Sequence, residues 1–349
     1  MPPRVAEAPT RMSAASRHDI LAAFARFQSP VLGRSLGQIA STFLPFFALM
    51  AAMYALAWLV SPWASLLLAV PAGAFVVRIF IIQHDCGHGA FFRARAANEW
   101  LGRACSLFTL TPFANWRRQH ANHHAVWNNL DRRAGGADIY STCLTTREYA
   151  ALSPWRRALY RVTRHPLVAQ VLLPPLVFLL LYRVPFDTPR AWRRERMSVL
   201  ATNAALVALF SALVWLAGAG PVLLVQLSTM IVASIIGVWL FSVQHRFEQV
   251  VWSRQESWDA TRAALYGSSY LKLPRVLQWF SGNIGFHHIH HLVPRVPNYR
   301  LEECHRAFAS IGGRVRGLTL AQALRASAYQ LWDEDADRMV RVADLPPGR

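Results

Sequence analysis

Nine of the thirteen histidines in this 349-residue chain lie in three short segments, which we call the histidine boxes. Box one is His84–His88, box two is His120–His124 and box three is His287–His291. Imidazole is the commonest metal ligand at neutral pH, and crowding is tolerable for neutral rings but costly for cations. One such box alone is often half of a zinc site or a coincidence at a helix end. Three boxes in one chain predict a shared metal site.

The spacing within each box places its histidines on one face of a helix, because residues three and four apart lie on the same face. Eight histidines satisfy this spacing and are predicted metal ligands: His84, His88, His120, His123, His124, His287, His290 and His291. His245 directly follows the last long apolar segment and is the ninth predicted ligand. The competing interpretation of His245 is a side chain that snorkels to the membrane surface.

His288 needs separate treatment, since it lies about 100° around a helix from His287. We expect it beside the ligands or exposed, although a ligand set of His287, His288 and His291 also fits helical spacing. Eight or nine nitrogens exceed the four that tetrahedral zinc needs, so the count predicts two metal ions. Imidazole suits iron, copper and zinc, and ligand type therefore leaves the metal open.

Ligating imidazoles usually have their other nitrogen held by a carboxylate or a carbonyl. Five acids near the boxes are available for this role: Asp85, Asp131, Asp138, Glu248 and Asp259. Each taken alone is more typical of a solvated surface acid. We favour Asp131, which follows His124 by seven residues. Asn283, four residues before His287, is predicted either to face the metals or to cap a helix.

The composition indicates a membrane protein, because 54% hydrophobic residues and a mean hydropathy of +0.21 accompany a net charge of +18. Apolar runs gather in four segments long enough to cross a hydrocarbon core of about 30 Å. These predicted spans are 38–60, 64–82, 198–216 and 222–243. Short uncharged turns join them into two hairpins.

Arginine sets the predicted orientation, since it concentrates in residues 1–37, 84–197 and 245–349. The positive-inside rule places all three regions in the cytoplasm. The predicted fold is thus an all-α integral membrane protein of four transmembrane helices, with a cytoplasmic helical cap that holds a dinuclear metal site. Residues 1–37 form an N-terminal cytoplasmic segment, and residues 38–349 form a single membrane domain.

Two further apolar runs, 101–113 and 166–182, are short for spans, and the second contains Pro174 and Pro175. A crossing at 166–182 would put boxes two and three on opposite sides of the membrane. We therefore predict that both runs lie in the interface or are re-entrant.

Smaller features complete the predicted organisation. Residues 18–27 form an amphipathic surface helix, on the membrane or on the protein. Helices are predicted from Asn298 to Phe308 and from a capping box at Thr319 to about Trp332. The four separated cysteines indicate reduced thiols, and the first 34 residues do not resemble a cleavable signal peptide. The basic surface favours anionic lipids or an acidic protein over nucleic acid.

With these residues in view, the chain resembles the membrane fatty acid desaturase family, particularly the bacterial omega-6 (delta-12) type. The resemblance rests on the three boxes in order, with two spans between the second and third. Flanking segments 282–286, 292–299 and 243–248 strengthen it, and it extends from about residue 40 to about residue 310.

The resemblance implies a non-haem di-iron centre with the box histidines and His245 as iron ligands. Oxygen and two electrons would then convert adjacent methylenes of an acyl chain into a cis double bond. The acyl chain would arrive on phospholipid, coenzyme A or a carrier protein. One departure is Phe241, where stearoyl-type relatives have an asparagine ligand, and Asn283 is a possible replacement. We expect no fused cytochrome domain, so a separate carrier such as ferredoxin would supply electrons.

Other functions fit parts of the pattern. The same scaffold supports hydroxylases, acetylenases and carotenoid oxygenases, which differ in how the substrate radical is resolved. A histidine-rich metal transporter or sensor is a non-catalytic alternative. Transport requires polar residues within the spans. The first two spans contain one ionisable side chain, Arg78, which disfavours a transporter.

Overall fold

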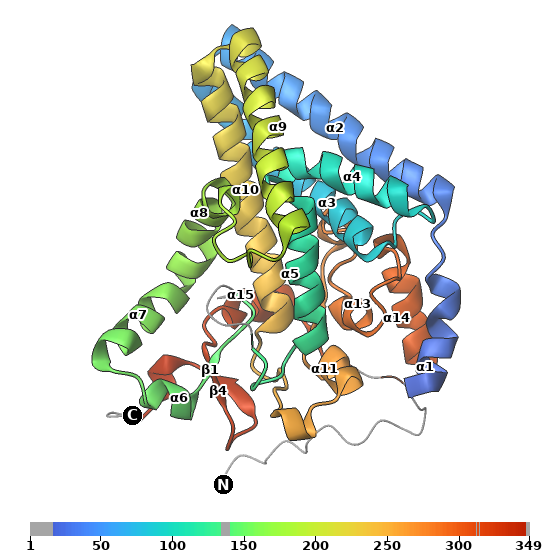
Figure 1. The fold of residues 1–349 in the computed structure, drawn as a ribbon, viewed down its shortest axis with the longest axis vertical. Coiled ribbons are helices and arrows are strands. Elements are labelled where there is room, and N and C mark those ends of the chain that lie inside the picture. The colour runs from blue at the N-terminus through green and yellow to red at the C-terminus, as the bar shows by residue number, and fades with distance from the viewer. Residues whose placement is uncertain (1–16, 134–139, 312, 314, 347–349) are drawn as a thin grey trace.

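Four long apolar helices extend the structure along its longest axis (Figure 1). The computed structural model describes residues 17–133, 140–311, 313 and 315–346. Each helix is long and apolar enough to cross a membrane, as the four predicted spans require. They are α2 (Leu32–Leu59), η2 with α3 (Pro62–Leu68 and Ala69–His88), α9 (Arg193–Ala217) and α10 (Ala219–His245).

Local sequence explains where these helices begin and end. Ser61 caps η2 by accepting a hydrogen bond from the backbone nitrogen of Trp63, and Pro62 occupies the first helical position. Gly218 separates α9 from α10 with a φ of 81°, a conformation that glycine adopts without steric cost. The two turns therefore end α2 and α9 and start the long helices that follow them.

Shorter helices surround the lower ends of α3 and α10 (Figure 1). α4 runs across α3 and carries most of the apolar run 101–113. The helices are α1 (Arg17–Phe24), α4 (Arg95–Thr109), α5 (Phe113–Val126), α6 (Thr146–Ala150), α7 (Pro154–Arg164), α8 (Leu173–Leu179), α11 (Ala260–Tyr266), α12 (Arg275–Phe280), α13 (His287–Leu292), α14 (Leu301–Ser310) and α15 (Leu320–Ala326). The single turns are η1 (Ala25–Phe27), η3 (Val168–Leu172), η4 (Leu181–Arg183), η5 (Gln255–Ser257), η6 (Asn298–Arg300) and η7 (Val342–Asp344).

The apolar run 166–182 forms η3, α8 and η4, which meet α7 at an angle of 57°. Both η3 and α8 pack against α10, while Leu172, Leu176 and Leu180 remain exposed. By length and composition this bent pair is a broken span or a re-entrant element.

Two small sheets correct the prediction of an all-α fold. In the first, β4 (Leu331–Asp333) pairs parallel with β1 (Leu144–Thr145) and antiparallel with β5 (Arg338–Val340). In the second, β2 (Tyr270–Leu271) pairs parallel with β3 (Gly317–Leu318).

The strands also shorten the last predicted helix. Thr319 and Gln322 do form the capping box of α15, but the helix ends at Ala326. Trp332 lies in β4 with 2% of its surface exposed. Strand pairing and burial in the core thus override the local helical pattern.

The predicted N-terminal amphipathic helix is α1 with η1, and it packs on the protein. Phe24 is fully buried, and its ring lies 6.2 Å from that of Phe308 on α14. The remainder of the predicted N-terminal segment, residues 1–16, lies outside the described residues.

Candidate metal centre

The histidines come from four helices whose ends meet. Box one ends α3, His245 ends α10, box two lies on α5 and box three forms most of α13. Gly282 and Asn283 have φ values of 53° and 59°, so the chain turns sharply just before α13. This turn and the packing of α3 on α10 bring residues separated by two hundred positions to one place.

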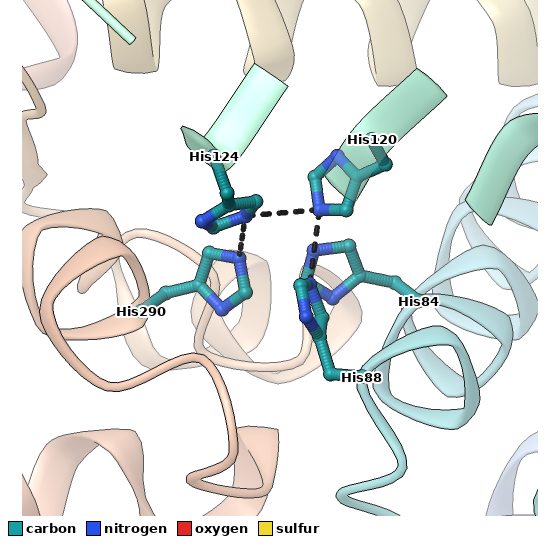
Figure 2. Close-up of side chains that lie close together, drawn as sticks. All are labelled: His84, His88, His120, His124 and His290. Carbon is teal, nitrogen blue, oxygen red and sulfur yellow. Dashed lines mark hydrogen bonds between the residues drawn. The ribbon is translucent and has the colours of Figure 1, made fainter. Parts of the chain in front are cut away.

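Five histidines form the first group, in which one ligand nitrogen from each ring lies within 4.8 Å of the others. Figure 2 shows these rings pointing toward one another from three helices. Neighbouring Nε2 atoms are 3.0 to 3.1 Å apart in a chain that passes from His88 through His120 and His124 to His290. The members are His84, His88, His120, His124 and His290.

The second group lies beside the first and contains His123, His245 and His291. The Nε2 atom of His245 lies 3.1 Å from that of His123 and 3.0 Å from that of His287. His287 therefore adds a fourth imidazole to this group. The structure thus brings together all nine histidines predicted as ligands.

The donor set fits metal ions better than a hydrogen-bonded histidine cluster. A neutral imidazole has one N–H donor, so converging Nε2 atoms cannot all be paired with one another. Among the described residues, Nδ1 of His84, His245 and His287 and Nε2 of His291 are also buried without a hydrogen-bond partner. A cation between the converging lone pairs would satisfy them.

Burial prepares these imidazoles to act as neutral ligands. It holds the pKa of His124, His290 and His291 well below the usual value, and the neighbouring imidazoles lower it further. The same causes, in the same order, lower the pKa of His120 and His287. Neutral rings can accept a metal without first losing a proton.

These pKa shifts predict loss of metal and of stability in acid. Unfolded histidines bind protons near pH 6.5, whereas the folded ones stay neutral, so the unfolded state gains stability as pH falls below that value. Protons also compete for the ligands. We expect bound metal to fall steeply between about pH 7 and pH 5, measured by elemental analysis after dialysis at each pH. Full metal retention and unchanged thermal unfolding at the acidic limit would contradict this expectation.

Box one itself contains a buried carboxylate. Asp85 has 3% of its surface exposed, and its Oδ2 accepts hydrogen bonds from the backbone nitrogen and the Nδ2 of Asn298, at 2.7 and 2.8 Å. The Asn298 side chain also exchanges hydrogen bonds with Gln38 on α2. The other oxygen of Asp85 lies 3.6 Å from Nδ1 of His84. Asp85 thus connects box one to the segment that follows box three.

The other polar residues proposed as supports lie in different surroundings. Asp131 is exposed and binds Arg254 and the backbone nitrogen of Gln255, contrary to our preference for it beside a ligand. Glu248 pairs with Arg338, and Asp259 caps α11. Asp138 lies outside the described residues.

Both polar atoms of the Asn283 side chain are hydrogen-bonded to residues other than histidine. Its Oδ1 accepts from Gln278, and its Nδ2 donates to the carbonyl of Asn298. The ring of Phe241 packs 5.0 Å from that of His245 and 5.5 Å from that of His123. An apolar ring therefore occupies the position of the asparagine expected in stearoyl-type relatives, and the Asn283 side chain is engaged by Gln278 and Asn298.

His288 is fully buried but belongs to neither group. Its Nε2 lies 3.0 Å from Nδ1 of His305 on α14, and Tyr270 packs against both rings. The ligand set that includes His288 is thus not the one assembled in this structure. Spacing within box three could not reveal His305 as its partner, because that contact depends on how α14 packs.

Two tryptophans beside the histidines were not singled out from the sequence. Trp116 stacks on His120, with ring centroids 4.7 Å apart and planes at 15°. Trp127 lies 4.1 Å from His245 and 4.9 Å from His123. Both lie on or directly after α5, at positions four before and four after a box-two histidine. Helical spacing from box two would have pointed to them.

A comparison with known families identifies the assembly. The model of the fatty acid desaturase family matches residues 61–317, a range that contains all three boxes and His245. The chain belongs to the fatty acid desaturase family. This desaturase is 43% identical to a fatty acid desaturase of Bacillus subtilis over 316 residues, which cover 90% of the chain and 88% of the relative.

More distant relatives share the same region. The desaturase is 26% identical to an sn-1 oleoyl-lipid 12-desaturase of Picosynechococcus, with 72% of the chain and 70% of the relative covered. It is also 26% identical to an sn-1 acyl-lipid omega-3 desaturase (ferredoxin) of Synechocystis, over 81% of the chain and 77% of the relative. The protein is therefore an oxidoreductase of the membrane desaturase family, and not the transporter considered from sequence alone.

Proposed function

We propose that this desaturase uses two iron ions, dioxygen and two electrons to introduce a cis double bond into an acyl chain. The observation that carries the proposal is the meeting of nine imidazoles in two adjoining groups. Desaturation is an oxidation, which favours a redox-active ion over zinc. Iron, when bound, would supply the activation of oxygen, and the protein would supply its position.

The proposed ligands divide by group. One ion would be held by His84, His88, His120, His124 and His290, and the other by His123, His245, His287 and His291. The chain's own residues fix the rings in place: Asp85 lies beside His84, and Trp116 and Trp127 cover the sides of the two groups. Phe241 adds apolar surface next to His245. Such packing excludes water and restricts ring rotation.

The proposed topology follows from the number of membrane crossings between boxes two and three, which must be even. Boxes two and three lie on either side of α9 and α10 in sequence, and their histidines meet in one cluster. Two crossings return the chain to its starting side, so we propose that the bent pair of α7 and α8 is re-entrant. With the arginine-rich regions in the cytoplasm, the spans form two hairpins in a bacterial inner membrane beneath a cytoplasmic cap. We retain residues 1–37 as a segment separate from the membrane domain at 38–349.

Relatives suggest the substrate and the electron donor. The names of two cyanobacterial relatives specify acyl-lipid substrates, and one specifies ferredoxin. We propose an acyl lipid as substrate, a ferredoxin-like carrier as donor and delta-12 (omega-6) placement of the double bond. The net charge of +18 would favour an acidic carrier and anionic membrane lipid.

Expression in a host with simple fatty acids tests the proposal. We expect gas chromatography with mass spectrometry to show a new cis double bond at carbon 12 of oleoyl chains, since the proposed site removes hydrogens from two adjacent methylenes. The His88→Ala variant, expressed at matched level, is the control and is expected to give none. A hydroxylated or triple-bonded product would instead favour a hydroxylase or acetylenase, and oxidation of an added carotenoid would favour a carotenoid oxygenase.

A further inference from the structure

Two buried tryptophans connect the second histidine group to the surface. The ring of Trp127 lies 4.1 Å from that of His245, 4.9 Å from His123 and 6.1 Å from His291. On its other side, Trp127 contacts Trp252, with ring centroids 5.2 Å apart. Each tryptophan exposes 4% of its surface. The aromatic contacts are therefore continuous from three histidines to Trp252.

Trp252 in turn lines a pocket of about 270 Å³. Leu130 and Trp332 share its walls, and the exposed side chains of Arg254, Arg262 and Asp337 stand at its rim. A pocket of this size admits a small solute but not a protein domain. The chain of rings thus ends where a soluble small molecule can approach Trp252.

The charges around this pocket are balanced. Arg254 pairs with Asp131 at 2.7 Å and with Glu334 at 2.8 Å, and the lining also contains one further base, Arg262, and one further acid, Asp337. A mixed surface gives little attraction for a strongly acidic electron carrier. The pocket is therefore poorly suited to deliver the two electrons of each normal turnover.

Indole is among the side chains that lose an electron most readily, and an oxidising metal centre that lacks an acyl chain needs an electron source. We propose that Trp127 and Trp252 form a protective electron relay that reduces the oxidised metal centre when no substrate is bound. The inference rests on the proposed oxygen-dependent function. Its external reductant is a small thiol in the Trp252 pocket.

The electrons balance as follows. The Trp127 ring would give one electron to the oxidised centre and take one from Trp252, and Trp252 would take one from a thiol. No bond to either ring forms or breaks. After two such transfers, two thiols have become one disulfide and released two protons. Together with two electrons from the carrier and two further protons, one dioxygen is reduced to two waters.

Hydrogen bonding suits the two rings to this role. Nε1 of Trp127 donates to the carbonyl oxygen of Gly267 at 2.7 Å, which stabilises positive charge on that ring and gives its proton no base to move to. Nε1 of Trp252 is buried without a hydrogen-bond partner in the described structure. Neither ring is thus arranged to lose a proton irreversibly.

The test uses full-length, iron-loaded protein in a detergent without fatty acyl chains, supplied with reduced ferredoxin and oxygen. Peptide mass spectrometry then measures indole oxidation at each tryptophan. We expect several-fold more oxidation at Trp252 and Trp127 than at Trp332, and suppression by glutathione. The matched control is Trp332, which lines the same pocket with 2% exposure but has no ring contact with Trp127 or the histidines in the described structure.

Variants add a second readout. Trp252→Phe is expected to move oxidation onto Trp127 and the ligand histidines, and to shorten the time for which the enzyme stays active during substrate-free turnover. Trp332→Phe is expected to leave the oxidation of Trp252 unchanged. Equal oxidation of Trp332 and Trp252 would overturn the relay, as would glutathione-independent labelling. A slower reduction of the metals by ferredoxin in Trp252→Phe would also overturn it, in favour of electron entry. If the enzyme desaturates an acyl lipid but Trp252 and Trp127 are not selectively oxidised, the relay alone is rejected. If it neither forms a desaturated product nor consumes oxygen, the proposed function is rejected together with the relay.

Discussion

Replacement of His124 by alanine is expected to abolish double-bond formation and to lower bound iron from two ions to about one or fewer. His124 links box two to box three within the first group, through an Nε2 contact of 3.0 Å with His290. Its removal leaves an open position and a void among buried rings. Iron per protein is measured by elemental analysis of purified, membrane-extracted enzyme, and product by chromatography of its lipids.

His288 supplies the control for this experiment, because it is a buried histidine of the same box that faces His305 instead of the metal groups. His288→Asn is expected to cost about 1–3 kcal/mol of folding free energy, with the iron content unchanged. If it lost as much iron as His124→Ala, the division of box three described above would be wrong.

Asp85→Asn is expected to weaken metal binding by about 10- to 100-fold, the usual effect of losing a residue that orients a ligand. One oxygen of the carboxylate accepts both hydrogen bonds from Asn298. An amide in its place either turns its NH2 group toward both of those donors or accepts with a weaker, uncharged oxygen. The link between α3 and the segment after α13 is loosened in either case. Competition with a chelator measures the affinity, and thermal unfolding measures the stability.

Asp131→Asn is the matched control, since this acid lies seven residues after box two but is exposed and paired with Arg254. We expect the stability of this variant to stay close to that of the wild type, because exposed ion pairs contribute little, and its metal affinity to be unchanged. Equal losses in the two variants would mean that Asp85 acts through general charge and not through its buried contacts.

The sequence was most informative where one helix carried the whole pattern. The i, i+3, i+4 spacing of box two predicted correctly that His120, His123 and His124 lie on one side of α5. Four apolar runs likewise predicted the four long helices, because length and apolarity are local properties.

Contacts between distant segments were beyond this reasoning. The choice of Asp131 over Asp85 relied on distance along the chain, whereas the burial of Asp85 depends on Asn298, which is 213 residues away. The end of α15 depends on pairing of β4 with β1, which lies on the other side of α9 and α10 in the sequence. Such contacts arise only when the tertiary structure forms.

The adjacent histidine pairs in boxes two and three have a consequence for metal loading. His124 and His290 belong to the first group, whereas their neighbours His123 and His291 belong to the second. For the proposed dinuclear centre, both α5 and α13 are therefore shared between ions. The first ion to bind orders the helices that also carry ligands for the second ion. Binding of the second ion then costs less conformational entropy of the chain. The two ions are accordingly expected to load cooperatively, with little of the singly loaded protein at equilibrium.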